Sequence, residues 1–89
     1  MPTYVKQHWN ELRGDEHDLW GTSWWYFEID DEGSVLRQIE QYESGMCLRY
    51  GEQNPVDEFG QLAQKPLDLS MPGYDAISPQ EFEAIWFSS

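Results

Sequence analysis

The sequence predicts an α+β fold: an antiparallel meander sheet of about four strands with a C-terminal helix packed on one face. Within Ser23–Tyr50, runs rich in aromatic and β-branched residues are separated by two glycine-containing turns, which is typical of a meander. Near the end of the chain, apolar residues instead recur at spacings of three and four, which is typical of a helix. With 89 residues, the chain is expected to form a single domain over residues 1–89.

The first predicted strand is Thr3–Trp9, which alternates between two faces. A polar, turn-rich segment follows at Asn10–Gly21 and predicts a loop that contains a cluster of carboxylates. We expect Leu19 and Trp20 to attach the end of this loop to the body of the protein, or to begin the next strand.

The central strands are predicted at Ser23–Asp30, Val35–Glu43 and Met46–Tyr50. In the first of them, alternation places Trp25, Phe27 and Ile29 on one face and Trp24, Tyr26, Glu28 and Asp30 on the other. The second has apolar residues on both faces, so a β-bulge and burial on both sides are alternatives. Within it we expect Ile39 to point inward and Glu40 outward.

The segment between the sheet and the helix is less regular. Gly51–Pro55 breaks the strand pattern, and Val56–Gln64 could hold one or two helical turns, although Gly60 disfavours them. Lys65–Ala76 is expected to be a connection with a short edge segment. The alternating residues of that edge segment are Leu67, Leu69 and Met71.

The predicted helix begins with a clear capping signal. Ser78 is a good N-cap, Pro79 occupies the favoured first helical position, and Glu81 completes the capping-box pattern. An apolar stripe follows, formed by Phe82, Ile85 and Trp86. Because so short a helix is marginal alone, we expect this stripe to dock on the apolar face of the sheet.

Charge restricts the possible partners. Seventeen Asp and Glu residues face five Lys and Arg, which gives a formal net charge of −12. This excess argues against direct binding of nucleic acid or of an anionic membrane, and it permits a basic protein partner. The alternative is that the charge serves solubility alone. A single cysteine, Cys47, and no signal-peptide pattern or long apolar run predict a cytoplasmic protein.

No residue pattern supports a catalytic or metal site. His8 and His17 are expected in a strand and in a loop, and their spacing matches no known set of metal ligands. Asp30–Gly33 lacks the alternating oxygen ligands and flanking helices of a calcium loop. Pairs of carboxylates arise by chance in so acidic a chain, and Ser78 lies in a capping context. We therefore expect no enzyme activity, no metal and no cofactor.

The remaining candidate is a partner-binding surface. The face that carries Trp24, Tyr26 and Glu28 would show aromatic rings among carboxylates if the helix leaves it uncovered. The alternative is that the helix and the loops cover both faces of the sheet. The residues expected to bind a partner are Asp15, Glu16, Asp18, Trp24, Tyr26, Glu28, Asp30, Asp31 and Glu32.

Several short segments carry a resemblance. They are Tyr4–Trp9 (YVKQHW), Glu28–Asp31 (EIDD), Arg37–Tyr42 (RQIEQY), Gly45 followed by Tyr50, and Ile77–Trp86 (ISPQEFEAIW). On these segments the chain resembles an uncharacterised family of small acidic bacterial proteins, which are similar to immunity proteins encoded beside polymorphic toxins. Ile77–Trp86 is the most specific segment. The loop Asn10–Thr22 and the pair Trp24–Trp25 depart from the family pattern and could carry individual specificity.

The resemblance implies a small acidic interaction protein, an immunity protein that binds and neutralises a cognate bacterial toxin. Its partner would be a basic toxin or nuclease, and electrostatic attraction would speed association. The first alternative is an acidic nucleic-acid mimic, encoded by a phage or mobile element, that inhibits a nuclease or defence system. A further alternative is a small ligand-binding domain with a deep pocket. Homodimerisation through an exposed sheet edge also stays open.

Overall fold

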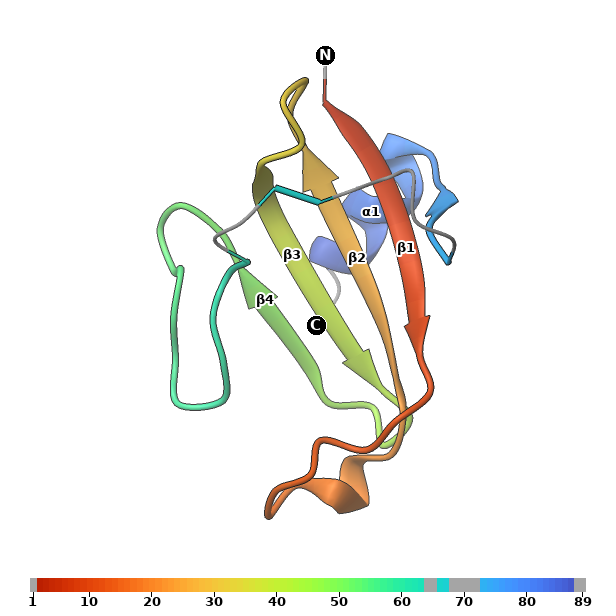
Figure 1. The fold of residues 1–89 in the computed structure, drawn as a ribbon, viewed down its shortest axis with the longest axis vertical. Helices are drawn as coiled ribbons and strands as arrows, with labels where there is room; N and C mark the ends of the chain where they lie inside the picture. Colours follow the sequence, from red (N-terminus) through yellow and green to blue (C-terminus); the bar gives the residue numbers. More distant parts are fainter. Residues whose placement is uncertain (1, 64–65, 68–72, 88–89) are drawn as a thin grey trace.

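The structure is a computed structural model that describes residues 2–63, 66–67 and 73–87. It confirms the α+β class: an antiparallel sheet carries a C-terminal helix (Figure 1). The strands are β1 (Thr3–Trp9), β2 (Ser23–Ile29), β3 (Val35–Tyr42), β4 (Cys47–Tyr50) and β5 (Asp75–Ala76), and the helix is α1 (Pro79–Trp86). A short 3₁₀ helix, Asp18–Trp20, lies in the loop between β1 and β2.

The sheet has five strands in the order β4-β3-β2-β1-β5. The first four in sequence are the predicted meander, since each pairs antiparallel with the next. The additional strand, β5, is only two residues long and pairs Val5 with Ala76 and Lys6 with Asp75. The edge segment expected at Leu67, Leu69 and Met71 cannot be compared, because Leu69 and Met71 lie outside the described residues.

A β-bulge resolves the ambiguous facing of β3. Glu28 pairs with Arg37, whereas the next residue, Ile29, pairs with Val35, so Leu36 is the extra residue. Beyond the bulge, Arg37 and Ile39 share the face of β2 that carries Tyr26 and Glu28.

Both faces of the sheet are covered, and α1 lies on the face opposite to the one expected. The fully buried Phe82 packs on Tyr26 and Ile39, with Tyr4 beside them. The expected docking face contributes Phe27 to a separate core. The members of that core and the side chains packed on it are Val5, Trp25, Phe27, Ile29, Val35, Leu62, Ala63, Leu67 and Tyr74. Figure 1 shows α1 behind the sheet and residues 66–67 in front of it.

The helical turns expected in Val56–Gln64 are absent from the described residues 56–63, so this expectation was wrong. An isolated bridge pairs Val56 with Gln61, and Asp57 organises the turn between them. Asp57 Oδ1 accepts hydrogen bonds from the amides of Phe59, at 2.8 Å, and Gly60, at 3.1 Å, and from the Tyr50 hydroxyl, at 2.9 Å. An Asp side chain that satisfies nearby amides in this way favours a turn over a helix.

The start of α1 is as predicted. Ser78 Oγ accepts a hydrogen bond from the Glu81 amide at 3.0 Å, and Pro79 occupies the first helical position.

Candidate functional site

The residues predicted to bind a partner do not form one surface. Asp15, Glu16 and Asp18 lie in the loop before β2, and Asp30, Asp31 and Glu32 lie in the hairpin after it (Figure 1). The seven residues of β2 separate these two groups, which corresponds to roughly 23 Å at the usual rise per strand residue. We call them the loop patch (Asp15, Glu16, Asp18) and the hairpin patch (Asp30, Asp31, Glu32).

Two of the three predicted residues between the patches are covered by α1. Tyr26 is 7% exposed and Glu28 is 9% exposed, while Trp24 is 37% exposed. The His8 ring lies 4.7 Å from the Trp24 ring, and the Lys6 ammonium lies 5.1 Å from its centroid. Of the two alternatives left by the sequence, coverage of both faces is therefore the one observed, and Trp24 remains partly exposed.

Glu28 belongs to an internal ion-pair network that ties three strands to the helix. Its carboxylate accepts hydrogen bonds from Arg37 Nε at 2.7 Å, Arg37 Nη2 at 3.1 Å and the Tyr4 hydroxyl at 2.7 Å. Arg37 also pairs with Glu83 of α1, and its guanidinium lies 4.9 Å from the centroid of the Phe82 ring. The bonds from Arg37 lower the pKa of Glu28 despite its burial. Glu28 is thus buried, and its carboxylate is engaged by β1 and β3 within the fold.

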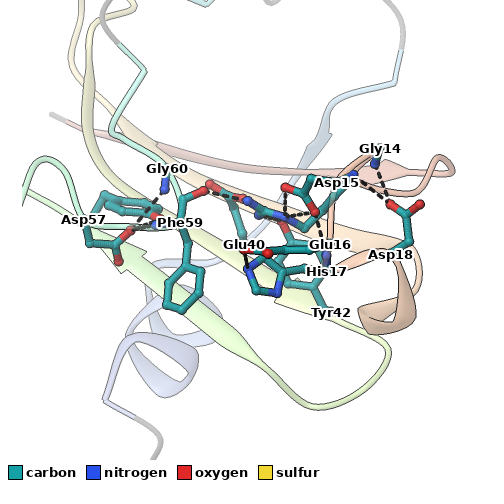
Figure 2. A network of polar contacts seen from close by, with 12 residues as sticks. Gly14, Asp15, Glu16, His17, Asp18, Glu40, Tyr42, Asp57, Phe59 and Gly60 are labelled. Carbon is teal, nitrogen blue, oxygen red and sulfur yellow. Dashed lines mark hydrogen bonds and ion pairs between the residues drawn. The ribbon is translucent and has the colours of Figure 1, made fainter.

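The loop patch is held by Arg13, which sequence reasoning missed. Arg13 Nε donates to Asp15 Oδ2 at 3.0 Å, Nη1 donates to the Tyr42 hydroxyl at 2.9 Å, and Nη2 donates to the Phe59 carbonyl at 2.7 Å. The three partner residues, Asp15, Tyr42 and Phe59, are labelled in Figure 2. These contacts connect the loop to β3 and to the segment after β4. The available signal was that Arg13 is the one Lys or Arg within the acidic segment Asn10–Gly21.

Two of the three carboxylates in the loop patch shape the loop itself. Asp18 Oδ1 accepts hydrogen bonds from the amides of Gly14 at 2.6 Å and Asp15 at 3.1 Å, and Asp15 Oδ1 accepts one from His17 at 2.8 Å (Figure 2). The bond from the His17 amide is the main cause of the lowered pKa of Asp15. Glu16 is highly exposed, and its Oε1 lies 3.5 Å from His17 Nε2. Glu16 is therefore the member of the patch best placed to face a partner.

The hairpin patch divides in the same way. Asp30 Oδ1 accepts hydrogen bonds from the amides of Glu32 and Ser34, each at 2.9 Å, so Asp30 fixes the turn. The side chains of Asp31 and Glu32 are exposed at its tip.

An aromatic cluster packs against the loop and connects it to the rest of the protein. The Trp20 ring stacks on His17 at 4.3 Å and contacts Tyr42 at 5.2 Å and Phe59 at 5.3 Å. The Arg13 guanidinium lies 5.3 Å from the centroid of the Trp20 ring. Aromatic rings and cations in such contacts contribute stability in addition to that gained from the apolar surface they bury. The expectation that Trp20 attaches the loop to the body is confirmed, whereas Leu19 is exposed.

A buried carboxylate lies beneath this cluster. Glu40 is 4% exposed, so the expectation that it points outward was wrong, because the loops cover its face of β3. It accepts a hydrogen bond from the Tyr42 hydroxyl at 2.9 Å (Figure 2). It accepts another from Gln38 Nε2, also at 2.9 Å. Burial raises the pKa of Glu40, while these bonds and the nearby Arg13 act in the opposite direction and Asp57 adds to the increase. Burial also raises the pKa of Tyr42 to about 12, which keeps its hydroxyl able to donate.

Replacing Glu40 by glutamine is expected to raise the melting temperature at neutral pH. The amide oxygen can still accept the bond from Gln38, the amide NH2 group can donate to the Tyr42 hydroxyl oxygen, and the side chain places no charge in the buried site. Because the pKa of Glu40 is raised by folding, its ionisation lowers stability as the pH rises through the folded-state value. Below the ordinary glutamate pKa, about 4.3, both proteins carry a neutral group, and the difference should vanish.

Thermal melts between about pH 4 and pH 8 check this prediction, with the exposed Glu52→Gln as the matched control. A variant that melts below the wild type at neutral pH would contradict it.

The Lys and Arg side chains of the described residues contact other groups of the fold. Arg13 and Arg37 bond to carboxylates, and Arg49 Nη2 donates to the Ile85 carbonyl at 3.3 Å. Lys6 lies 3.8 Å from Glu81. The carboxylate residues classed as exposed are Glu11, Asp15, Glu16, Asp18, Asp31, Glu32, Glu43, Glu52, Asp57, Glu58, Asp75 and Glu81. The described arginines are thus half-buried, whereas most of the described carboxylates are exposed.

A groove with a volume of about 910 Å³ opens to solvent beside the end of α1. Trp86, Leu62, Leu36 and Arg37 are among the residues that line it. Among the described residues, no three His, Cys, Asp or Glu side chains gather closely enough to hold a metal ion. No helix of residues 2–63, 66–67 and 73–87 is long and apolar enough to cross a membrane.

Comparison of the chain with family models, with curated proteins and with solved structures found no match.

Proposed function

We propose that the protein is a small acidic interaction protein of the cytoplasm, an immunity protein that binds and neutralises a cognate basic toxin. One observation carries the proposal. The described arginines are half-buried in internal hydrogen bonds, whereas most described carboxylates are exposed. The molecule therefore presents a negative field that the folded chain does not neutralise, and such a field steers a basic protein toward it.

The loop patch is the favoured contact because its support is rigid. Arg13 and Trp20 fasten the loop to β3 and to the segment after β4. A surface that is ordered before binding loses little conformational freedom when the partner arrives. Binding there would neutralise a toxin by covering its active site or the path of its substrate.

The arrangement of carboxylates supports an immunity protein over a nucleic-acid mimic. A mimic needs a regular acidic stripe in which carboxylates stand where phosphates do. Here the predicted partner-binding carboxylates that are exposed gather in two loops at opposite ends of β2. The groove beside α1 is the feature that a ligand-binding domain would use, and it is the third candidate.

Reversing the charges of two exposed glutamates in the β1–β2 loop, Glu16 of the loop patch and the nearby Glu11, tests the proposal. The full-length protein is immobilised, the basic protein it retains from native lysate at low salt is purified, and association is measured for Glu11→Lys/Glu16→Lys. We expect association about tenfold slower than for the wild type, with a weaker dependence on salt, because steering falls with local charge. Asp15 and Asp18 are left in place because they shape the loop.

The matched control is Asp31→Lys/Glu32→Lys in the hairpin patch, which changes the net charge equally and spares Asp30. A smaller decrease in the association rate for this control assigns the contact to the loop patch. Equal decreases for the two variants would instead assign the attraction to the net charge of the whole protein. Retention of no basic protein at low salt would overturn the proposed function.

A further inference from the structure

Leu19 is the most exposed large apolar side chain among the described residues. It is 96% exposed, although it lies between Asp18 and the inward-facing Trp20 within the 3₁₀ helix. The same short helix therefore directs one large apolar side chain into the aromatic cluster and the next one into solvent.

The backbone that carries Leu19 is fixed on both sides. The amide of Trp20 donates to the His17 carbonyl at 2.9 Å, and the amide of Gly21 donates to the Asp18 carbonyl at 3.1 Å. The Trp20 carbonyl accepts a hydrogen bond from the Ser44 amide at 3.1 Å, which ties the turn to the β3–β4 hairpin. The exposed side chain thus projects from a braced turn, and little backbone freedom remains to be lost when it is buried.

The surroundings of Leu19 define the chemistry of what could cover it. Its flanking loop carries the exposed Glu16 and Glu11, and the cation of the loop, Arg13, points inward. A partner that buries Leu19 therefore needs an apolar pocket with basic side chains at its rim. Apolar anchors surrounded by a polar rim are the usual centre of a protein–protein contact.

We propose that Leu19 is the apolar anchor of the partner-binding surface and inserts into an apolar, basic-rimmed pocket of the partner protein. This inference rests on the proposed function and deepens it. Carboxylates then govern how fast the partner associates, whereas Leu19 governs how slowly it leaves.

The test begins with photo-crosslinking. A benzophenone amino acid is placed at position 19 or, as a control, at position 56, where Val56 is 59% exposed in another loop. The full-length proteins are irradiated in native cells, the protein crosslinked through position 19 is identified and purified, and it serves as the probe. Dissociation constants are then measured for the wild type, Leu19→Ala and Val56→Ala.

We expect a basic protein to crosslink at position 19 and not at position 56. Leu19→Ala should weaken its binding about tenfold or more, mainly through faster dissociation, since burying a leucine is worth that factor. Val56→Ala should bind as the wild type does. Because Leu19 makes so little contact in the fold, its alanine variant should melt at the wild-type temperature.

The other outcomes overturn the inference in distinguishable ways. If the probe binds Leu19→Ala as tightly as the wild type, the anchor is wrong and the proposed function stands. The same holds if immobilised wild-type protein retains a basic partner that never crosslinks at position 19. If neither crosslinking nor retention yields a basic protein, both the anchor and the proposed function fail.

Discussion

Replacing Phe82 by alanine is expected to lower the free energy of unfolding by about 3–5 kcal/mol. Phe82 is 0% exposed and connects α1 to the sheet through Tyr26 and Ile39. Its ring lies 5.3 Å from that of Tyr4 on β1, so the substitution leaves a cavity bordered by three strands. A loss of this size is a large fraction of the stability of a small domain.

Chemical denaturation of the purified variant measures this loss. Phe87→Ala is the matched control, because it removes the same side chain one residue after α1, where it is 76% exposed. We expect the control to change stability by less than about 0.5 kcal/mol.

Removing the chain from Pro79 onward should destabilise the whole domain further than Phe82→Ala does. A truncated protein that melts at the wild-type temperature would contradict the docking of α1 on the sheet.

The elements of this fold were predictable because their signals are local. The bounds of β1 match the predicted Thr3–Trp9, since alternation and flanking turn residues define a strand within a few positions. The start of α1 was equally predictable, because a Ser-Pro capping signal depends only on neighbouring residues. The turn at Asp57 was missed because its side chain competes with helix formation in a way that spacing alone does not reveal.

The docking face of α1 could not be predicted in this way. Alternation identified Phe27 and Ile29 as the more apolar face of β2, and that face does form a core. The alternation pattern carries no information that Arg37 and Glu83, which are 46 residues apart, pair on the other face. Partners so distant in sequence make a polar face suitable for burial.

The candidate site also combines residues whose exposure is predictable from local sequence with residues whose burial depends on distant segments. Exposure of Glu16, Asp31 and Glu32 followed from their position in polar turns, which is a local property. The burial of Glu28 and Glu40 depended on cover provided by α1 and by the segment after β4. Likewise, no periodicity distinguishes the outward Leu19 from the inward Trp20, because the difference arises from contacts of Trp20 with Tyr42 and Phe59.

Replacing Arg37 by methionine is expected to destabilise the protein by about 3 kcal/mol at neutral pH, since a buried carboxylate then loses its ionic partner. Methionine retains most of the aliphatic volume over Phe82 and Trp86, whose ring centroids lie 4.9 Å and 5.0 Å from the guanidinium carbon. The loss therefore reports mainly on Glu28, which keeps only its hydrogen bond from the Tyr4 hydroxyl among the contacts described above.

The dependence of this loss on pH identifies its cause. Folding lowers the pKa of Glu28, chiefly through the bonds from Arg37, so the wild type gains stability above the ordinary glutamate pKa. That gain disappears as the pH falls through the folded-state value. The gap between Arg37→Met and the wild type should accordingly be widest at neutral pH and shrink in acid.

A double-mutant cycle separates this electrostatic effect from lost packing. Adding Glu28→Gln to Arg37→Met removes the uncompensated charge, so the double variant should be more stable at neutral pH than Arg37→Met alone. Glu28→Gln by itself should destabilise, because it weakens the pair while Arg37 keeps Glu83. Together with the stabilisation expected for Glu40→Gln, the cycle would show two buried glutamates of one sheet acting on stability in opposite directions, one paired with a cation and one desolvated. Additive losses in the cycle, with no change between neutral and acid pH, would assign the role of Arg37 to packing alone.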